Sequence, residues 1–185
     1  MIDAMQWFQL NGKKAMVTGG AAGLCYAMAE GLHLAGAEVV LVDRSPAVGE
    51  AAARLGAQGA PVHGVQGDLS HWEGIPALYD RALAALGGRG VNVNAIAPGY
   101  MVTQLTADMQ GKNPAQYAEI TGRIPMHRWG QPEDLQGAVV FLASPAAAPS
   151  CRWTAATWGS EDSSKFPCNS ADLCEKGMNP WGFVD

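Results

Sequence analysis

The chain has few charged residues and no long apolar run. Charged residues make up 16% of its 185 residues and the net charge is −5, so we expect no broad basic surface for nucleic acid and favour a small-molecule partner. No apolar run is long enough to span a bilayer, and the first five residues lack the basic start of a secretory signal. We therefore expect a cytoplasmic protein without a membrane partner.

Residue types that commonly bind metals are also sparse. The four cysteines and four histidines are scattered, with no C-x-x-C spacing: Cys25, Cys151, Cys168, Cys174, His33, His63, His71 and His127. This distribution predicts neither a metal centre nor a disulfide framework. A metal or disulfide site at Cys168 and Cys174 is the alternative, but no histidine or second cysteine pair lies nearby in the sequence.

A glycine-rich turn stands between a predicted strand and a predicted helix. Residues 14–17 lead directly into Thr-Gly-Gly-Ala-Ala-Gly at positions 18–23. Glycines let the backbone turn tightly against a pyrophosphate, and the free N–H groups of the following helix supply partial positive charge. A second apolar run ends on Asp43, about twenty residues past the last glycine, where a carboxylate can accept hydrogen bonds from a ribose. The pattern predicts a dinucleotide site; an ordinary glycine-rich turn is the alternative.

Predicted strands and helices alternate along the chain. Apolar residues recur at helical spacing over residues 24–34, and the stretches 47–55, 75–86 and 132–142 also have helical character. Short strands are predicted over residues 39–42, 62–65 and 91–96. This alternation indicates an α/β fold, a doubly wound parallel sheet with helices on both faces. The length requires only one domain.

Several motifs together resemble the short-chain dehydrogenase/reductase family. They are T-G-x-x-x-G at residues 18–23, Asp43, Gly-Asp-Leu at 67–69, Asn-Val-Asn-Ala-Ile-Ala-Pro-Gly at 92–99, and Arg-Trp-Gly-Gln-Pro-Glu-Asp-Leu at 128–135. The resemblance extends over roughly residues 8–147 and implies a Rossmann-type fold. Within the family, Gly-Lys at 12–13 and residues 94–101 and 123–125 resemble the gluconate 5-dehydrogenase and 2-deoxy-D-gluconate 3-dehydrogenase group.

The resemblance implies a set of cofactor-binding residues. They are Thr18, Gly19, Gly23 and Leu24 at the pyrophosphate turn, Asp43 at the adenosine ribose, Asp68 and Leu69 at the adenine, and Pro98, Gly99 and Thr103 in the loop beside the nicotinamide. Two have structural alternatives, because Asp68 suits a turn and Thr103 suits a helix N-cap before residues 104–106. Asp43 favours NAD over NADP, since a carboxylate repels a 2′-phosphate, although Arg44 offers a compensating charge.

Two departures from the family pattern stand out. Cys25 occupies the place of a third glycine, where the added side chain could cost ~1–3 kcal/mol through overpacking; we interpret it as a small buried hydrophobe. The family's catalytic Y-x-x-x-K pair and its catalytic serine are absent. The tyrosines at 26, 79, 100 and 117 are followed four residues later by Glu, Leu, Gln and Thr. No catalytic residue is therefore assigned.

The Asn-Asn-Ala-Gly segment of the family is also missing. The family's fourth and fifth strands and its catalytic helix are skipped between Leu86 and Val91, with the join near residues 87–90. We predict that residues 91–96 fill the vacant place beside residues 14–17 through a right-handed crossover.

From residue 148 onward the composition changes. Residues 1–147 are predicted to form a truncated dinucleotide-binding domain, and residues 148–185 a tail outside the family that we expect to be disordered. The family's last strand is lost here. Plausible codons for residues 149–159, read two bases later, encode Val-Leu-Pro-Val-Asp-Gly-Gly-Tyr-Leu, which resembles the family's ending, so a frameshift is our interpretation of the tail.

These observations leave three functional hypotheses. The resemblance implies an NAD-dependent oxidoreductase acting on a sugar acid or similar secondary alcohol, without turnover in this chain because no phenol–lysine pair can take the alcohol proton. A non-catalytic NAD-binding module and a truncated product without function are the alternatives. A homo-oligomer is the family expectation, but loss of the last strand removes surface that family members use to associate.

Overall fold

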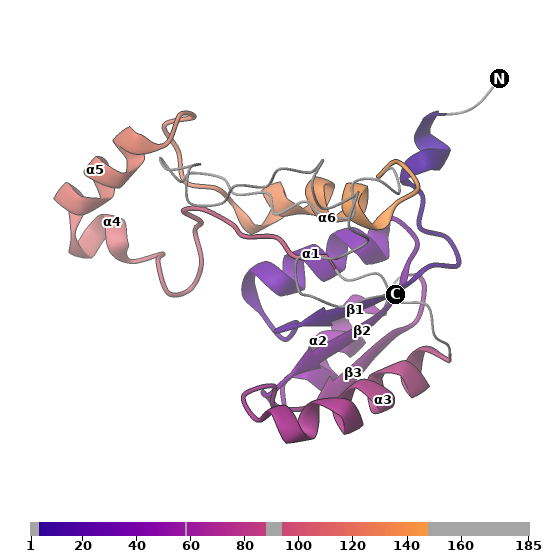
Figure 1. The fold of residues 1–185 in the computed structure, drawn as a ribbon. Helices are drawn as coiled ribbons and strands as arrows, with labels where there is room; N and C mark the ends of the chain where they lie inside the picture. Colours follow the sequence, from indigo (N-terminus) through magenta and orange to yellow (C-terminus); the bar gives the residue numbers. More distant parts are fainter. Residues whose placement is uncertain (1–3, 58, 88–93, 148–185) are drawn as a thin grey trace, which may run out of the picture.

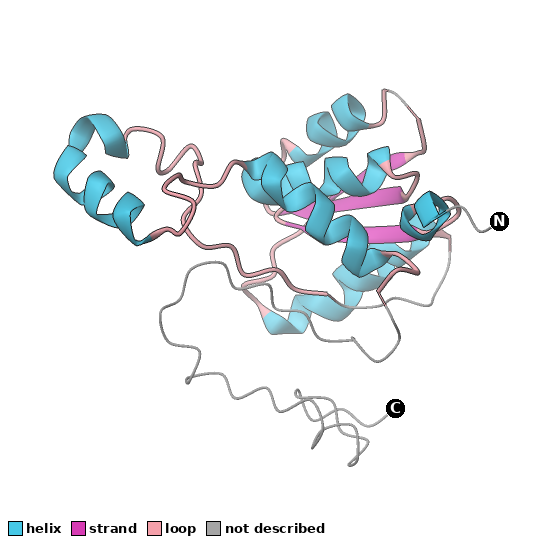
Figure 2. Cartoon of the chain, turned by 90° about the horizontal axis from the view of Figure 1, so that it is seen from above, coloured by secondary structure: helices cyan, strands magenta, loops and turns pink. Residues whose placement is uncertain are grey.

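The computed structural model describes residues 4–57, 59–87 and 94–147. Its centre is a parallel sheet of three strands in the order β1-β2-β3, comprising Lys14–Thr18, Glu38–Asp43 and Val62–Gln66. The connecting helices are α1 (Gly23–Leu34) and α2 (Val48–Leu55), and α3 (Ile75–Leu86) follows β3. Figure 1 shows α1 and α3 on opposite sides of this sheet, and Figure 2 shows the same chain from above. The predicted α/β architecture is confirmed.

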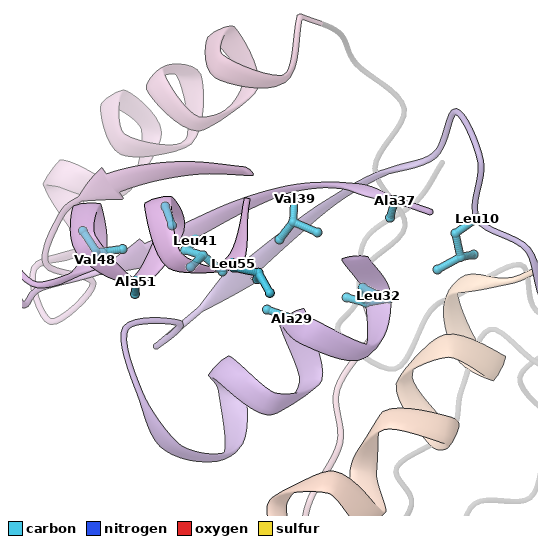
Figure 3. Close-up of a cluster of buried hydrophobic side chains, with 10 residues drawn as sticks. Leu10, Ala29, Leu32, Ala37, Val39, Leu41, Val48, Ala51 and Leu55 are labelled. Atoms are coloured by element: carbon cyan, nitrogen blue, oxygen red, sulfur yellow. The ribbon is translucent and has the colours of Figure 1, made fainter. Parts of the chain in front are cut away.

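The central strand β2 contributes to a separate apolar cluster on each face of the sheet. Val39 and Leu41 pack with side chains of α1 and α2, as Figure 3 shows. Val40 and Val42 pack on the other face with α3. All four are at most 1% exposed. Alternate side chains of a strand point to opposite faces, so a continuous apolar run is the pattern of a strand covered on both sides.

The second half of the described chain consists of helices joined by long loops. A small lobe contains α4 (Met109–Lys112) and α5 (Pro114–Arg123), and Figures 1 and 2 both show it away from the sheet. A 3₁₀ turn, η3 (Pro132–Leu135), leads into α6 (Gln136–Ala143). Two further 3₁₀ turns are η1 (Ala4–Phe8) and η2 (Trp72–Gly74). The predicted helix at 132–142 is thus found as a 3₁₀ turn followed by an α-helix.

Helix α6 packs closely on α1. A Cβ at Gly31 would lie 2.8 Å from the Gln136 Cβ, so only glycine permits this approach. The Gln136 side-chain amide also donates to Glu30 Oε2 at 3.0 Å. The contact fixes α6 against α1, the first helix of the half that contains the sheet.

The predicted strand at 91–96 is wrong for the residues that the structure describes. Residues 94–96 are not in a strand, and the Asn94 side-chain amide donates to the Leu142 carbonyl at 3.5 Å, beside α6. A β-strand forms only when its backbone pairs with a neighbouring strand. Asn94 is bonded to α6, so this segment does not pair with the sheet. Residues 91–93 and the tail from 148, with its proposed frameshift and three of the cysteines, lie outside the described residues. No described helix is long and apolar enough to cross a membrane.

Candidate dinucleotide site

The glycine turn joins the end of β1 to the start of α1. Gly19 and Gly23 have φ values of +69° and +65°, a backbone region that other residues rarely adopt. The Gly19 amide donates to the Val42 carbonyl at 2.8 Å, which draws the turn against β2. Gly20, which the sequence analysis did not select, is buried, and a Cβ there would lie 3.0 Å from Leu41 Cδ2. Its position inside a glycine-rich turn was the available signal for this close packing.

The start of α1 is suited to an anion. Its N-cap, Ala22, is extended and has no side chain that caps the helix, and its first turn contains no acidic residue. The first N–H groups of a helix have no intrahelical acceptor and carry partial positive charge. A Cβ on Gly23 would meet nothing within 4 Å, so the turn is open on that side. Thr18 and Gly23 are exposed and Leu24 is half-buried in the same turn.

Asp43 holds the glycine turn and its own loop together. Its Oδ2 accepts from the Ala21 amide at 3.0 Å, and its Oδ1 accepts from the Ser45 amide at 2.9 Å. Its backbone carbonyl accepts from the Gly67 amide at 2.8 Å, at the end of β3. Each carboxylate oxygen has two lone pairs, so each retains one acceptor position for a further donor.

Asp68 and Leu69 lie in the turn that follows β3. Asp68 Oδ1 accepts from the Ser70 hydroxyl at 2.6 Å and from its amide at 2.8 Å. These bonds, with smaller contributions from His71 and Arg44, hold the pKa of Asp68 below its ordinary value. Asp68 therefore has the turn role that was the structural alternative for it, and within the described residues its Oδ2 accepts no hydrogen bond. Leu69 is 43% exposed, which leaves an apolar side chain at this corner.

Cys25 lies against the glycine turn. A Cβ built on Gly19 would be 3.4 Å from Cys25 Sγ, which is ordinary contact distance. Burial, and secondarily the negative charge of Asp43, raise the pKa of the Cys25 thiol. The protonated thiol is a poor nucleophile, and the contact with Gly19 suits a small packing residue. Cys25 is half-buried, however, and not fully buried as predicted.

Pro98, Gly99 and Thr103 belong to a separate part of the described structure. Pro98 and Gly99 line a mainly apolar pocket of about 310 Å³ together with residues after α5 and at the start of α6. Thr103 is engaged locally, because its amide donates to Thr106 Oγ1 at 2.8 Å. Residues 104–108 form turns and α4 begins only at Met109, so Thr103 is not a helix N-cap. Within the described residues, no hydrogen bond links this loop to the glycine turn.

The walls of that pocket are fixed by an ion pair. Arg128 donates to both oxygens of Asp134, at 2.7 and 3.3 Å. This pairing lowers the pKa of Asp134 and raises that of Arg128. The Gln131 amide donates to the same carboxylate at 2.8 Å, which completes a capping box at η3. The residues of the 128–135 motif thus organise a loop.

Aromatic stacking supports the same loop. Trp129 is 4% exposed and its indole N–H donates to Thr121 Oγ1 at 3.0 Å. Tyr117 stacks on it with ring centroids 5.1 Å apart, and Tyr100 approaches at 5.5 Å. The contact with Trp129 gives Tyr100 a packing role in this loop. In the described part of the chain, no group of three or more His, Cys, Asp or Glu residues is arranged to hold a metal ion.

Family models match both halves of the chain. Residues 13–89 match the short chain dehydrogenase model, and residues 81–149 match a related model described as enoyl-(acyl carrier protein) reductase. The chain belongs to the short-chain dehydrogenase/reductase family. Its members are oxidoreductases that bind NAD or NADP.

Similar curated proteins include sugar-acid dehydrogenases. A 61-residue segment is 54% identical to the 2-dehydro-3-deoxy-D-gluconate 5-dehydrogenase of Pseudoalteromonas atlantica, covering 33% of this chain and 24% of that protein. A 61-residue segment is 57% identical to the Escherichia coli enzyme of the same name, covering 31% and 22%. The matches thus span about a quarter of the length of these relatives.

Solved structures confirm the fold. A Beutenbergia cavernae protein, described as an NAD(P)-dependent gluconate 5-dehydrogenase with NADP bound at low occupancy, aligns with a TM-score of 0.63 and 27% identity, covering 76% of this chain and 93% of that chain. A 3-oxoacyl (acyl-carrier-protein) reductase from Agrobacterium tumefaciens with NADP bound aligns with a TM-score of 0.68 and 22% identity, covering 80% and 93%. The sheet of this dehydrogenase-family chain has only three strands within its described residues.

Proposed function

We propose that this chain binds NAD through the glycine turn, Asp43 and the Asp68 corner, and that it does not turn over substrate. Its ancestry is that of oxidoreductases acting on a sugar acid or a similar secondary alcohol, as the named relatives suggest. The observation that carries the proposal is the Asp43 carboxylate, which holds the glycine turn in place and keeps acceptor positions for a ribose. We keep a cytoplasmic location as a prediction.

The residues of the turn fit a dinucleotide. The uncapped start of α1 offers N–H groups and no competing acid to the pyrophosphate. The remaining acceptor positions on Asp43 suit the two hydroxyls of the adenosine ribose. The exposed Leu69 offers an apolar contact for the adenine ring, and Pro98, Gly99 and Thr103 are proposed to lie beside the nicotinamide end.

We infer a preference for NAD over NADP from the same carboxylate. A 2′-phosphate would stand against the negative charge of Asp43, which repels it. Arg44 is exposed and its charge acts on Asp68, so it reduces the repulsion at the adenosine end. The size of the preference for NAD therefore depends on how far the positive charge of Arg44 offsets the repulsion of a 2′-phosphate by Asp43.

The absence of turnover follows from the missing proton acceptor. Bound NAD supplies a hydride acceptor, but the substrate hydroxyl must also lose a proton. None of the tyrosines is followed by lysine at the fourth position. The Tyr26 hydroxyl accepts from Arg54 Nε at 3.1 Å, but this pair joins α1 to α2, and Tyr100 packs beside Trp129. Neither tyrosine has the lysine partner that lowers a phenol pKa in the family.

A fluorescence titration with NADH tests the binding. We expect saturable binding by the wild-type chain, weakened at least roughly tenfold in Asp43→Ala through loss of two ribose hydrogen bonds. Asp108→Ala removes an exposed carboxylate on the distant lobe and serves as the matched control, with unchanged affinity. No binding by the wild-type chain, or equal binding by both variants, contradicts the proposal.

A second variant of Asp43 separates the effect of its negative charge on cofactor choice from its effect on the conformation of the glycine turn. Asp43→Asn keeps one oxygen acceptor and removes the negative charge, so the ratio of NADPH to NADH affinity should rise. An unchanged ratio would show that Asp43 does not select the cofactor. Incubation with NAD and gluconate-like substrates should produce no NADH, and measurable NADH production would refute the absence of turnover without affecting the binding proposal.

A further inference from the structure

The apolar pocket next to the 128–135 loop lies between three segments of the described chain. Residues of the segment 96–101 form one wall, residues of the segment 124–130 form a second, and η3 with the start of α6 forms a third. Its volume is about 310 Å³. Small-molecule sites in proteins are concave and mostly apolar, and they begin at about this size. The pocket therefore has the dimensions of a ligand site.

Hydrogen bonds and close packing join the first two walls. The Val102 amide donates to the Gly130 carbonyl at 2.8 Å, and the Gly130 amide donates to the Tyr100 carbonyl at 3.0 Å. Met101 is 8% exposed, and its sulfur lies so close to Gly130 that a side chain at that position would collide with it. Walls that are joined before a ligand arrives lower the entropic cost of binding.

The described lining offers a ligand no unpaired charge. Among the described lining residues, only Tyr100, Arg128 and Asp134 have polar side chains. The Arg128 guanidinium donates to both Asp134 oxygens, and its Nη1 also donates to the Trp129 carbonyl at 3.2 Å. A carboxylate ligand would therefore meet a cation that is already paired and a negative charge beside it. The Tyr100 hydroxyl makes no hydrogen bond within the described residues, so it remains a neutral donor and acceptor.

We propose that this pocket binds an uncharged ligand with an apolar two-ring body and one hydroxyl or carbonyl group, and that it rejects sugar acids. An apolar protein cavity of about 150 Å³ accommodates one benzene ring, so a pocket of about 310 Å³ has room for two rings. Burial against the apolar lining stabilises the rings, and the Tyr100 hydroxyl bonds the single polar group. The site thus differs from what the names of the sugar-acid relatives suggest, and it needs no cofactor, so it stands independently of NAD binding.

Two naphthalene derivatives that differ in one group test the ligand class. 2-Naphthol is uncharged at neutral pH, whereas 2-naphthoate carries a carboxylate on the same rings. In equilibrium dialysis against the full chain without cofactor, we expect 2-naphthol to bind with a dissociation constant on the order of 0.1 mM. 2-Naphthoate and gluconate should bind at least roughly tenfold more weakly, because the lining has no unpaired cation. The proposal is overturned if 2-naphthol shows no saturable binding or if 2-naphthoate binds equally well.

Methyl resonances of ¹³C-labelled methionine locate the bound ligand. 2-Naphthol should shift the signals of Met101 and Met126, which line the pocket, and leave that of Met109 on α4 unchanged. Ala138→Leu adds side-chain volume at a lining position and should weaken binding at least roughly tenfold. Ala118→Leu, at an exposed position of α5, is the matched control and should bind like the wild-type chain. Binding that shifts neither lining methionine, or that Ala138→Leu leaves intact, would refute the assignment to this pocket.

Asp134→Asn provides a readout that does not depend on how much of the variant is folded. It removes the negative charge beside Arg128 and keeps an oxygen acceptor, so the guanidinium becomes available to a carboxylate ligand. The ratio of 2-naphthoate affinity to 2-naphthol affinity should therefore rise at least roughly fivefold. Both ligands are measured on one preparation, so the unfolded fraction cancels from this ratio. An unchanged ratio would contradict the role of the ion pair in rejecting acids.

Discussion

Removal of the Asp43 carboxylate should destabilise the chain even without a cofactor. Asp43→Ala deletes the acceptors of the Ala21 and Ser45 amides, at 3.0 and 2.9 Å. Hydrogen bonds to charged groups contribute about 1.5–3 kcal/mol each, and the lower value applies here because Asp43 is only partly buried. We therefore expect a loss of about 3 kcal/mol for Asp43→Ala and about half of that for Asp43→Asn, which keeps one acceptor.

Urea unfolding followed by circular dichroism measures this loss. With a denaturant slope of about 2 kcal/mol per molar, the midpoint should fall by about 1.5 M in Asp43→Ala and by about half as much in Asp43→Asn. Asp108→Ala loses only an exposed helix ion pair with Lys112 and should change the free energy of unfolding by less than about 0.5 kcal/mol. An Asp43→Ala midpoint equal to that of Asp108→Ala would refute the role of Asp43 in holding the turn.

Three further predictions concern residues around the site and the pocket. Cys25 should be alkylated by iodoacetamide more slowly than a free thiol at neutral pH, and faster in Asp43→Asn, as followed by peptide mass spectrometry; equal rates in both chains would exclude the influence of the carboxylate. The lowered pKa of Asp134 beside Arg128 contributes stability that is present above its ordinary value of 3.8 and lost as the pH falls through its folded value. Asp134→Asn should therefore flatten the acid side of a plot of melting temperature against pH, and an unchanged slope would contradict the ion pair. His127 has φ +50°, so His127→Gly should be more stable than His127→Ala by about 1 kcal/mol in urea unfolding, and the reverse order would exclude backbone strain at this position.

Much of the half that contains the sheet could be predicted because local signals and tertiary packing agree there. The run 39–42 was predicted as a strand, and its burial on both faces confirms that interpretation. The glycine turn and Asp43 were predicted near one another, and the structure joins them by the hydrogen bond from Ala21. Gly36 follows the end of α1, and its φ of +100° lies in the region that favours glycine.

Other elements could not be predicted because their signal is not local. Helix α5 buries only Ile120 among its residues, so it has little apolar periodicity to recognise. The run 91–96 has strand-like composition, but a strand forms only beside a partner, and Asn94 instead contacts α6. The bidentate pairing of Arg128 with Asp134 depends on a loop conformation that spacing alone does not specify.

The close packing of α1 on α6 has a consequence for cooperativity. At Gly31 the two helices approach so closely that no side chain fits between them, and Gln136 is bonded to Glu30 across the contact. Within the described residues, the later half of the chain adds no strand to the sheet, so its attachment depends on this helix pair instead of on a backbone ladder. Such an attachment lets one region open while the other stays folded. The three-stranded core and the region from 94 to 147 should accordingly behave as two units of different local stability within one family fold.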